Sequence, residues 1–218
     1  MRYATLLFLL CAAALGGEPF AFRVKSNFQP DKQTLCSQHG LSFPVRHDGN
    51  DYIITAAHVI LYAGNLAKNG EKPKEILVDF PVGWIRCEIV KLDRTFDLCV
   101  LRPAIKPPFV LNIEEKGPKE GQKIINPNFF VGMEMSMKKG KMTERIGPLW
   151  TARIEDFNHG SSGGPVLDEK GRVIALGIAM FPLEKDKALL VGSNIITKYL
   201  KLKGELDAKS LGLILKEE

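Results

Sequence analysis

The feature that constrains the fold most is a succession of short, strand-like runs separated by turn signals. Residues 52–55, Tyr-Ile-Ile-Thr, are β-branched and aromatic, and Asp48-Gly49 just before them is a dipeptide typical of tight hairpins. The expected strands, in chain order, are 41–46, 51–56, 76–80, 84–92, 98–102, 124–125, 129–137, 142–145, 149–154, a run from 166, 173–181 and 188–191. A helical turn is expected at 56–62 and a helix at 195–202.

A proline-rich segment at residues 103–108 divides these strands into two groups. Strands without alternating helices indicate an all-β chain of two antiparallel barrels or sandwich halves. The 218 residues can bury a sizeable core as one domain or as two closely packed halves. We expect a domain over 18–204, with halves at about 36–102 and 109–192 followed by the helix, and a tail at 205–218.

The N-terminus has the pattern of a secretory signal peptide. A basic head, an apolar run over 3–15 and small residues after it predict a signal over 1–17. The run is too short to favour a membrane span. Cys11 would suit a lipoprotein anchor, but it lies inside the apolar centre. We therefore predict a secreted or periplasmic protein that keeps no membrane anchor once the signal is removed.

Removal of the signal would leave three cysteines, an odd number for an exported chain. Cys87 and Cys99 lie on neighbouring strand-like runs, and both a disulfide and two reduced core thiols remain open. Cys36 and His39 have the spacing of half a zinc site, but no second such pair exists at ligand spacing. No metal and no cofactor are predicted.

The formal net charge of +5 comes from basic residues interleaved with acids along the whole chain. Residues 138–141, Lys-Lys-Gly-Lys, form the densest cluster, and it contains no aromatic residue. A solvated hairpin tip is the interpretation we adopt, and no nucleic-acid partner is predicted.

Residues 159–165, His-Gly-Ser-Ser-Gly-Gly-Pro, could expose a serine hydroxyl on a tight turn, with backbone N–H groups aimed at one point. Alone, such a run is more typical of a simple turn. Ser162 is the candidate nucleophile, because the glycine pair follows it directly. Ser161 has the same chemistry but stands one place earlier.

Two further residues change the interpretation. His58 ends a β-branched strand, and Asp97 opens an apolar run. Each alone would be a strand-end residue, but a serine nucleophile needs a histidine base and a buried acid that orients the histidine. The order His58, Asp97, Ser162, each in a suitable context, therefore predicts a catalytic triad.

The chain here resembles the chymotrypsin-like (trypsin-fold) serine proteases, in particular short bacterial and Deg-type domains without a PDZ module. The resemblance spans about residues 36–202 and rests on four matched runs, which are Thr55-Ala56-Ala57-His58-Val59, Asp97-Leu98-Cys99-Val100-Leu101, residues 160–167 and residues 171–178. It implies two packed six-stranded β-barrels, a triad in the cleft between them, and an oxyanion hole from the N–H groups of Gly160 and Ser162.

The resemblance also suggests where a peptide substrate would bind. Asp156 falls where trypsin-type enzymes carry the acid that selects Lys or Arg, although it is also simply a loop residue. His159 would flank the pocket entrance. Residues 179–181, Ala179, Met180 and Phe181, would form the strand edge on which an extended peptide pairs. No Ile-Val-Gly-Gly-like start is present, which favours an enzyme active without zymogen cleavage.

These patterns together predict a serine endopeptidase that acts through an acyl-enzyme. Two alternatives use the same scaffold, a catalytically silent binding or adhesion protein and an esterase-like hydrolase. The physiological substrate, the preferred residue at the cleavage site and the oligomeric state are not predicted.

Overall fold

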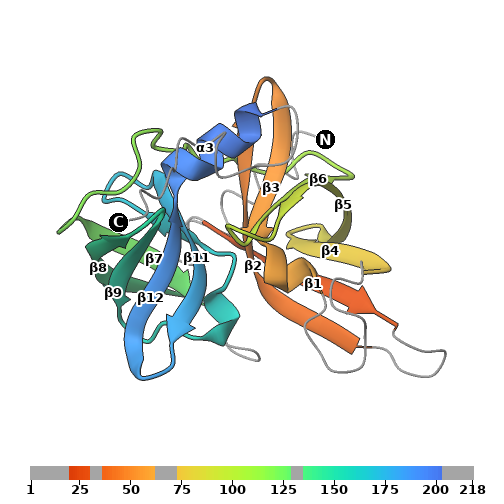
Figure 1. Cartoon of the computed structure of the whole chain (residues 1–218). Coiled ribbons are helices and arrows are strands. Elements are labelled where there is room, and N and C mark those ends of the chain that lie inside the picture. The colour runs from red at the N-terminus through yellow and green to blue at the C-terminus, as the bar shows by residue number, and fades with distance from the viewer. Residues whose placement is uncertain (1–19, 30–35, 62–72, 129–134, 203–218) are drawn as a thin grey trace.

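The protein folds into two closed antiparallel β-barrels that lie side by side (Figure 1). A computed structural model describes residues 20–29, 36–61, 73–128 and 135–202. The predicted signal peptide and C-terminal tail lie outside these residues, as does part of the predicted strand 129–137. The two six-stranded barrels confirm the predicted fold class, with a short C-terminal helix after the second barrel.

Each barrel is built from six consecutive strands. The strands of the first barrel are β1 (Phe22–Phe28), β2 (Cys36–His47), β3 (Asn50–Ala56), β4 (Glu75–Phe80), β5 (Gly83–Asp93) and β6 (Leu98–Pro103). The strands of the second barrel are β7 (Lys123–Asn128), β8 (Ser136–Ile146), β9 (Leu149–Ile154), β10 (Pro165–Leu167), β11 (Val173–Phe181) and β12 (Glu184–Gly192). The helical elements described are α2 (Ala57–Ile60), the 3-10 turn η1 (His159–Ser161) and α3 (Ser193–Lys201).

The predicted hairpin at Asp48-Gly49 forms as expected. Asp48 has φ 48° and Gly49 has φ 76°, so both central residues lie in the left-handed region. Asp and Gly tolerate this region better than most residues, and such turns match the twist of paired strands. The turn therefore sets the register in which His47 pairs with Asn50 and Ser42 with Thr55.

The segment between the barrels joins them by backbone contacts. The Leu111 amide donates to the Pro44 carbonyl at 2.8 Å in the first barrel, and the Glu114 amide donates to the Val173 carbonyl at 2.8 Å in the second. One cluster of buried apolar residues also runs from the first barrel into β11 and α3. The two barrels therefore share a core, and the surfaces that face each other are held in place.

Helix α3 follows the second barrel, packs against β11 and β12, and lies above the line where the barrels meet (Figure 1). Lys91 of β5 donates from Nζ to the carbonyls of Tyr199 and Leu200 at 2.8 and 3.1 Å. A cation at a helix C-terminus satisfies carbonyls that lack partners in the helix and interacts favourably with the helix dipole. Lys91 thus fixes the end of α3 to the first barrel.

Two features of the strand pattern differ from the sequence predictions. Strand β1 was not predicted, and it pairs with both β2 and β4 to close the first barrel. Residues 138–141 are not a hairpin tip, because they lie within β8 and pair with β7, Lys139 opposite Ile125 and Lys141 opposite Lys123. At Gly140 an added Cβ would lie 2.4 Å from the Arg153 carbonyl oxygen, so β8 and β9 approach closely there.

The structure decides between the alternatives left open for Cys87 and Cys99. Strands β5 and β6 do pair as a hairpin, but Cys87 lies opposite Pro103 and Cys99 opposite Leu92. Both are buried free thiols. Burial raises the pKa of Cys87 to about 12, and it raises the pKa of Cys99 as well. Two reduced core cysteines are therefore the correct interpretation.

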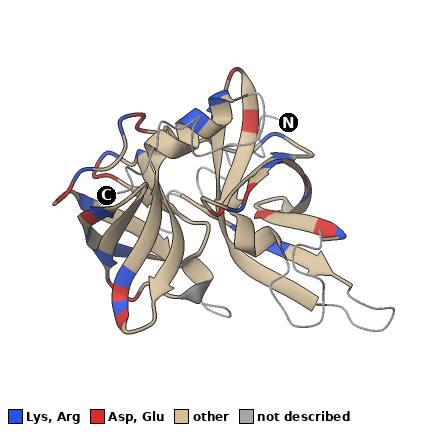
Figure 2. Ribbon diagram, viewed as in Figure 1, with Lys and Arg blue, Asp and Glu red and all other residues tan. Residues whose placement is uncertain are grey.

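The charge distribution is mixed over the described residues. Figure 2 shows Lys and Arg side by side with Asp and Glu on strands of both barrels. Within the described ranges, no helix has the length and apolar character needed to cross a membrane.

Candidate active site

His58 and Asp97 lie together at the edge of the first barrel that faces the second. His58 is in α2, directly after β3, and Asp97 precedes β6. The His58 ring Nδ1 is 2.6 Å from Asp97 Oδ2, while the His58 backbone N–H donates to Asp97 Oδ1 at 2.7 Å. One carboxylate therefore binds both the ring and the main chain of the histidine. This arrangement fixes the ring and favours a proton on Nδ1, which leaves Nε2 as the basic nitrogen.

The backbone at Asp97 is shaped for this contact. Asp97 has φ 53°, a left-handed conformation that aspartate adopts more readily than most residues. Its carbonyl also accepts the N–H of Ala57 at 3.0 Å. The loop before β6 and the start of α2 are thus joined by one hydrogen bond between main-chain groups and by two contacts to the Asp97 carboxylate, which hold the carboxylate beside Nδ1 of the imidazole.

Ser162 is held against the first barrel by its main chain. Its carbonyl accepts the N–H of Leu41 in β2 at 2.8 Å. The next residue, Gly163, has φ 86°, and a Cβ there would lie 2.1 Å from the Leu41 carbonyl oxygen. Only glycine fits this crossing without displacement. The Gly/Ser run is therefore the point at which the second barrel is bound to the first.

The two neighbouring serines have different environments. The Ser161 side chain is fully buried, and its hydroxyl donates to Oδ1 of Asn128 on β7. The Ser162 hydroxyl lines a pocket and donates to the Ile178 carbonyl at 3.3 Å. Of the two serines, Ser162 is the one that lines the pocket, and it is also the one that the sequence favoured as the candidate nucleophile. Asn128 was not singled out in the sequence.

The three predicted triad residues line one pocket between the barrels. Its volume is about 330 Å³, and its lining is His58, Asp97, Asn158, Ser162, Ile178, Ala179 and Met180. Ala179 and Met180 were predicted to contact substrate, whereas Asn158 and Ile178 were not. An asparagine directly before a short helical turn is a typical N-cap. That signal could have pointed to Asn158, because Asn158 caps η1.

Two other predicted substrate-binding residues, Asp156 and Phe181, lie outside the pocket lining. The Asp156 side chain is 77% exposed. Its carboxylate is 2.8 Å from Nζ of Lys138 on β8, so its charge already has a partner. Phe181 ends β11 outside the lining, with Lys187 Nζ 5.0 Å from its ring centroid. The backbone of His159 begins η1, and its side chain is not among the described groups.

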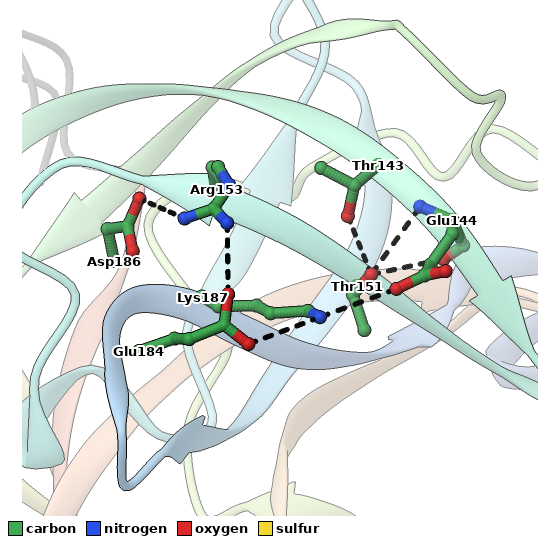
Figure 3. A network of polar contacts seen from close by, with 7 residues as sticks. All are labelled: Thr143, Glu144, Thr151, Arg153, Glu184, Asp186 and Lys187. Atoms are coloured by element: carbon green, nitrogen blue, oxygen red, sulfur yellow. Dashed lines mark hydrogen bonds and ion pairs between the residues drawn. The ribbon is translucent and has the colours of Figure 1, made fainter.

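The hairpin that carries Ala179 and Met180 is held by a polar network on neighbouring strands (Figure 3). Arg153 of β9 donates to Asp186 at 2.6 Å and to Glu184 at 2.9 Å on β12. Lys187 of β12 lies 3.4 Å from Glu144 of β8. Exposed ion pairs add little stability individually, but a network that spans three strands favours a single register. The orientation of β11 beside the pocket follows from that register.

The N–H of Gly160, one of the two predicted oxyanion donors, already has an acceptor in this structure. It donates to Oδ1 of Asn158 at 3.0 Å. The Ser161 N–H donates to the Asn158 carbonyl at 3.0 Å, which closes the 3-10 turn. The side chain and main chain of Asn158 thus hold the two amides that precede Ser162.

Possible metal ligands are not clustered in the part of the chain that the structure describes. No group of three or more His, Cys, Asp or Glu side chains there is arranged to hold a metal ion. Cys36 and His39 both belong to β2. Burial lowers the pKa of His39, and the nearby charges of Lys25 and Arg23 lower it further.

Comparison with known proteins agrees with the fold. The family model of the trypsin-like peptidase domain matches residues 40–176. The magnetosome formation protease MamE of Paramagnetospirillum magneticum is 24% identical over 155 residues, which cover 65% of this chain and 20% of MamE. The chain therefore spans about a fifth of the length of that curated relative.

Two solved structures share the fold. The active form of the Rv3671c protease from M. tuberculosis has a TM-score of 0.67 and 17% identity, over 89% of this chain and 86% of that one. The HtrA-type protease AlgW, solved with a decapeptide, has a TM-score of 0.65 and 17% identity, over 88% of this chain and 66% of that one. The family match covers more than half of the chain, so the protein belongs to the trypsin-like peptidase domain family.

Proposed function

We propose that this protein hydrolyses peptide bonds with Ser162 as nucleophile, His58 as general base and Asp97 as the residue that orients His58. The observation that carries the proposal is the 2.6 Å contact between His58 Nδ1 and Asp97, in the same pocket as the Ser162 hydroxyl. An aspartate that accepts the Nδ1 proton keeps Nε2 available as a base and stabilises the imidazolium that forms.

The reaction would proceed through an acyl-enzyme. The Ser162 hydroxyl turns from the Ile178 carbonyl to the His58 ring, Oγ attacks the peptide carbonyl carbon, and the serine proton passes to Nε2. The imidazolium gives that proton to the leaving amine as the C–N bond breaks. Water then attacks the ester carbonyl carbon while His58 takes one of its protons. The imidazolium returns that proton to Oγ as the C–O bond breaks, which releases the carboxylic acid product and regenerates the Ser162 hydroxyl.

Negative charge on the carbonyl oxygen would be stabilised by the N–H groups of Gly160 and Ser162. Such donors act strongly because they are fixed before the charge develops, and loss of one typically reduces the rate about 100- to 1000-fold. The substrate would be a protein or peptide, bound as an extended strand along Ala179 and Met180. The signal-like N-terminus supports export of the protein, to the periplasm or outside the cell.

A proteome-derived peptide library, digested with the wild-type protein and with Ser162→Ala, tests this function. We expect new peptide termini with the wild type and none above background with the variant. The variant should unfold at the wild-type temperature, since it loses only one hydroxyl. Equal cleavage by both proteins would show that Ser162 is not the nucleophile, and no cleavage by either would contradict peptidase activity.

A further inference from the structure

The side chain of Asn158 contacts two parts of the site at once. It lines the pocket together with the apolar side chains of Ile178 and Met180. Its Oδ1 accepts the Gly160 N–H at 3.0 Å, and its Nδ2 donates to the Asp156 carbonyl at 3.3 Å. A substrate side chain that enters the pocket would therefore meet the same group that occupies the Gly160 donor.

A backbone N–H makes one strong hydrogen bond at a time. While Gly160 donates to Asn158, it is not available to an oxyanion, so this hydrogen bond has to break before the transition state can use it. The asparagine amide is neutral and partly exposed, and water can replace its lost contacts. The net strength of one such bond corresponds to a shift of roughly 2- to 10-fold in an equilibrium.

We propose that Asn158 is a positioning residue that holds the oxyanion hole closed until a substrate side chain enters the pocket and displaces its amide. The proposal rests on the proposed function, because it assumes that Gly160 is an oxyanion donor. Binding of a side chain would then complete the catalytic site, a form of induced fit that favours substrates whose side chain reaches Asn158 between Ile178 and Met180.

The proposal predicts a split between binding and acylation that depends on the substrate. With p-nitrophenyl acetate, which has no side chain, the Gly160 bond is still intact in the bound complex. With the p-nitrophenyl ester of N-acetyl-leucine, the bond is already broken on binding. Removal of the Asn158 amide should therefore speed acylation by the acetate, and should tighten binding of the leucine ester without a change in its acylation rate.

The test uses Asn158→Ala and Asn158→Gly, with stopped-flow measurement of the dissociation constant and the acylation rate constant for both esters. We expect the acetate acylation constant to rise about 2- to 10-fold with its dissociation constant unchanged. For the leucine ester we expect the dissociation constant to fall by the same factor. Asn158→Gly should change both constants in the same way as Asn158→Ala, and it should keep the helical turn intact, since glycine caps a helical turn nearly as well as asparagine.

Asn50→Ala is the matched control. It removes another asparagine that bonds to a nearby main-chain group, the Asp48 carbonyl at 3.1 Å, in a hairpin outside the pocket. Both esters should react with it as with the wild type. If Asn158 only supported the loop, its variants would lower acylation by both esters, and this result would overturn the proposal. Failure of the wild type to react with either ester would instead overturn the proposed function.

Discussion

Gly40 of β2 is the residue whose substitution tests most sharply how the first barrel positions the nucleophile. An added Cβ at Gly40 would lie 2.7 Å from the Ser162 carbonyl oxygen and 2.8 Å from Cγ2 of Val59. Ordinary contact begins at 3.4 Å, so Gly40→Ala requires a displacement of about 0.7 Å relative to the Ser162 carbonyl oxygen and about 0.6 Å relative to Cγ2 of Val59. Val59 follows His58 directly, so either movement disturbs a triad residue.

A misplacement of about 1 Å can cost on the order of 100-fold in rate, and we therefore expect kcat to fall about 10- to 100-fold in Gly40→Ala. Overpacking of this kind should also lower the free energy of unfolding by about 1 to 3 kcal/mol. The assay is kcat and KM on a fluorogenic peptide from the library digest. Active-site titration corrects both values for the fraction of molecules that are folded.

Gly140→Ala is the matched control, because its Cβ would lie 2.4 Å from the Arg153 carbonyl oxygen, between β8 and β9 and outside the pocket lining. It should destabilise the protein at least as much while kcat per active molecule stays within about 2-fold of wild type. The positioning argument would be refuted if Gly40→Ala kept its kcat, or if both variants lost kcat equally.

Three further predictions concern other parts of the site and core. Asp97→Asn keeps a residue suited to φ 53°, so the unfolding temperature should change little, but it presents an N–H donor to His58 Nδ1. We therefore expect kcat to fall roughly 1000- to 10,000-fold. A fall under 10-fold would contradict the role of Asp97. In Asp156→Asn the ratio of cleavage after Lys or Arg to cleavage after Leu should stay within about 2-fold of the wild-type ratio, because Asp156 pairs with Lys138 outside the pocket. A selective loss of cleavage after basic residues in the library digest would show instead that Asp156 sets the specificity. In the native protein, Cys87 and Cys99 should resist iodoacetamide at pH 8 and should react once urea unfolds the chain, as measured by peptide mass spectrometry, because burial raises the pKa of Cys87 to about 12 and that of Cys99 as well. The same thiols ionise near pH 8.5 in the unfolded chain. Their contribution to the free energy of unfolding should therefore decrease as the pH rises above that value.

The strands with the most regular local pattern could be predicted from sequence. Strands β9 and β11 have the predicted bounds, and the hairpin at Asp48-Gly49 has the expected turn conformation. Strand β1 was missed because Ser26 and Asn27 have weak strand propensity, and its pairing with β2 and β4 brings together segments distant in the sequence.

Strand β8 shows how barrel closure overrides local propensity. Its lysines and Gly140 favour a turn when considered alone, but the strand pairs with β7 on one side and β9 on the other. Main-chain hydrogen bonds on both sides then outweigh the weak propensity of lysine and glycine for strands. Gly140 is required there because the two strands approach too closely for a side chain.

The three side chains of the candidate site and their place in a cleft could be predicted, but the residues that line the pocket could be predicted only in part. The motifs around His58, Asp97 and Ser162 depend on local sequence, and the structure brings these residues to one pocket. Which of Asn158, Asp156 and Met180 faces that pocket depends on the register of β11 and on the loop before η1. The bond between Asn158 and Gly160 depends on one side-chain rotamer, which no sequence pattern specifies.

The most direct test of the central claim is covalent labelling with a fluorophosphonate, with the modified residue located by peptide mass spectrometry. The proposed mechanism predicts one phosphonyl group per molecule, attached to Ser162, and at least 100-fold slower labelling of His58→Ala. Modification of Ser161 in its place, equal labelling of His58→Ala, or no reaction of the folded wild-type protein would contradict the claim.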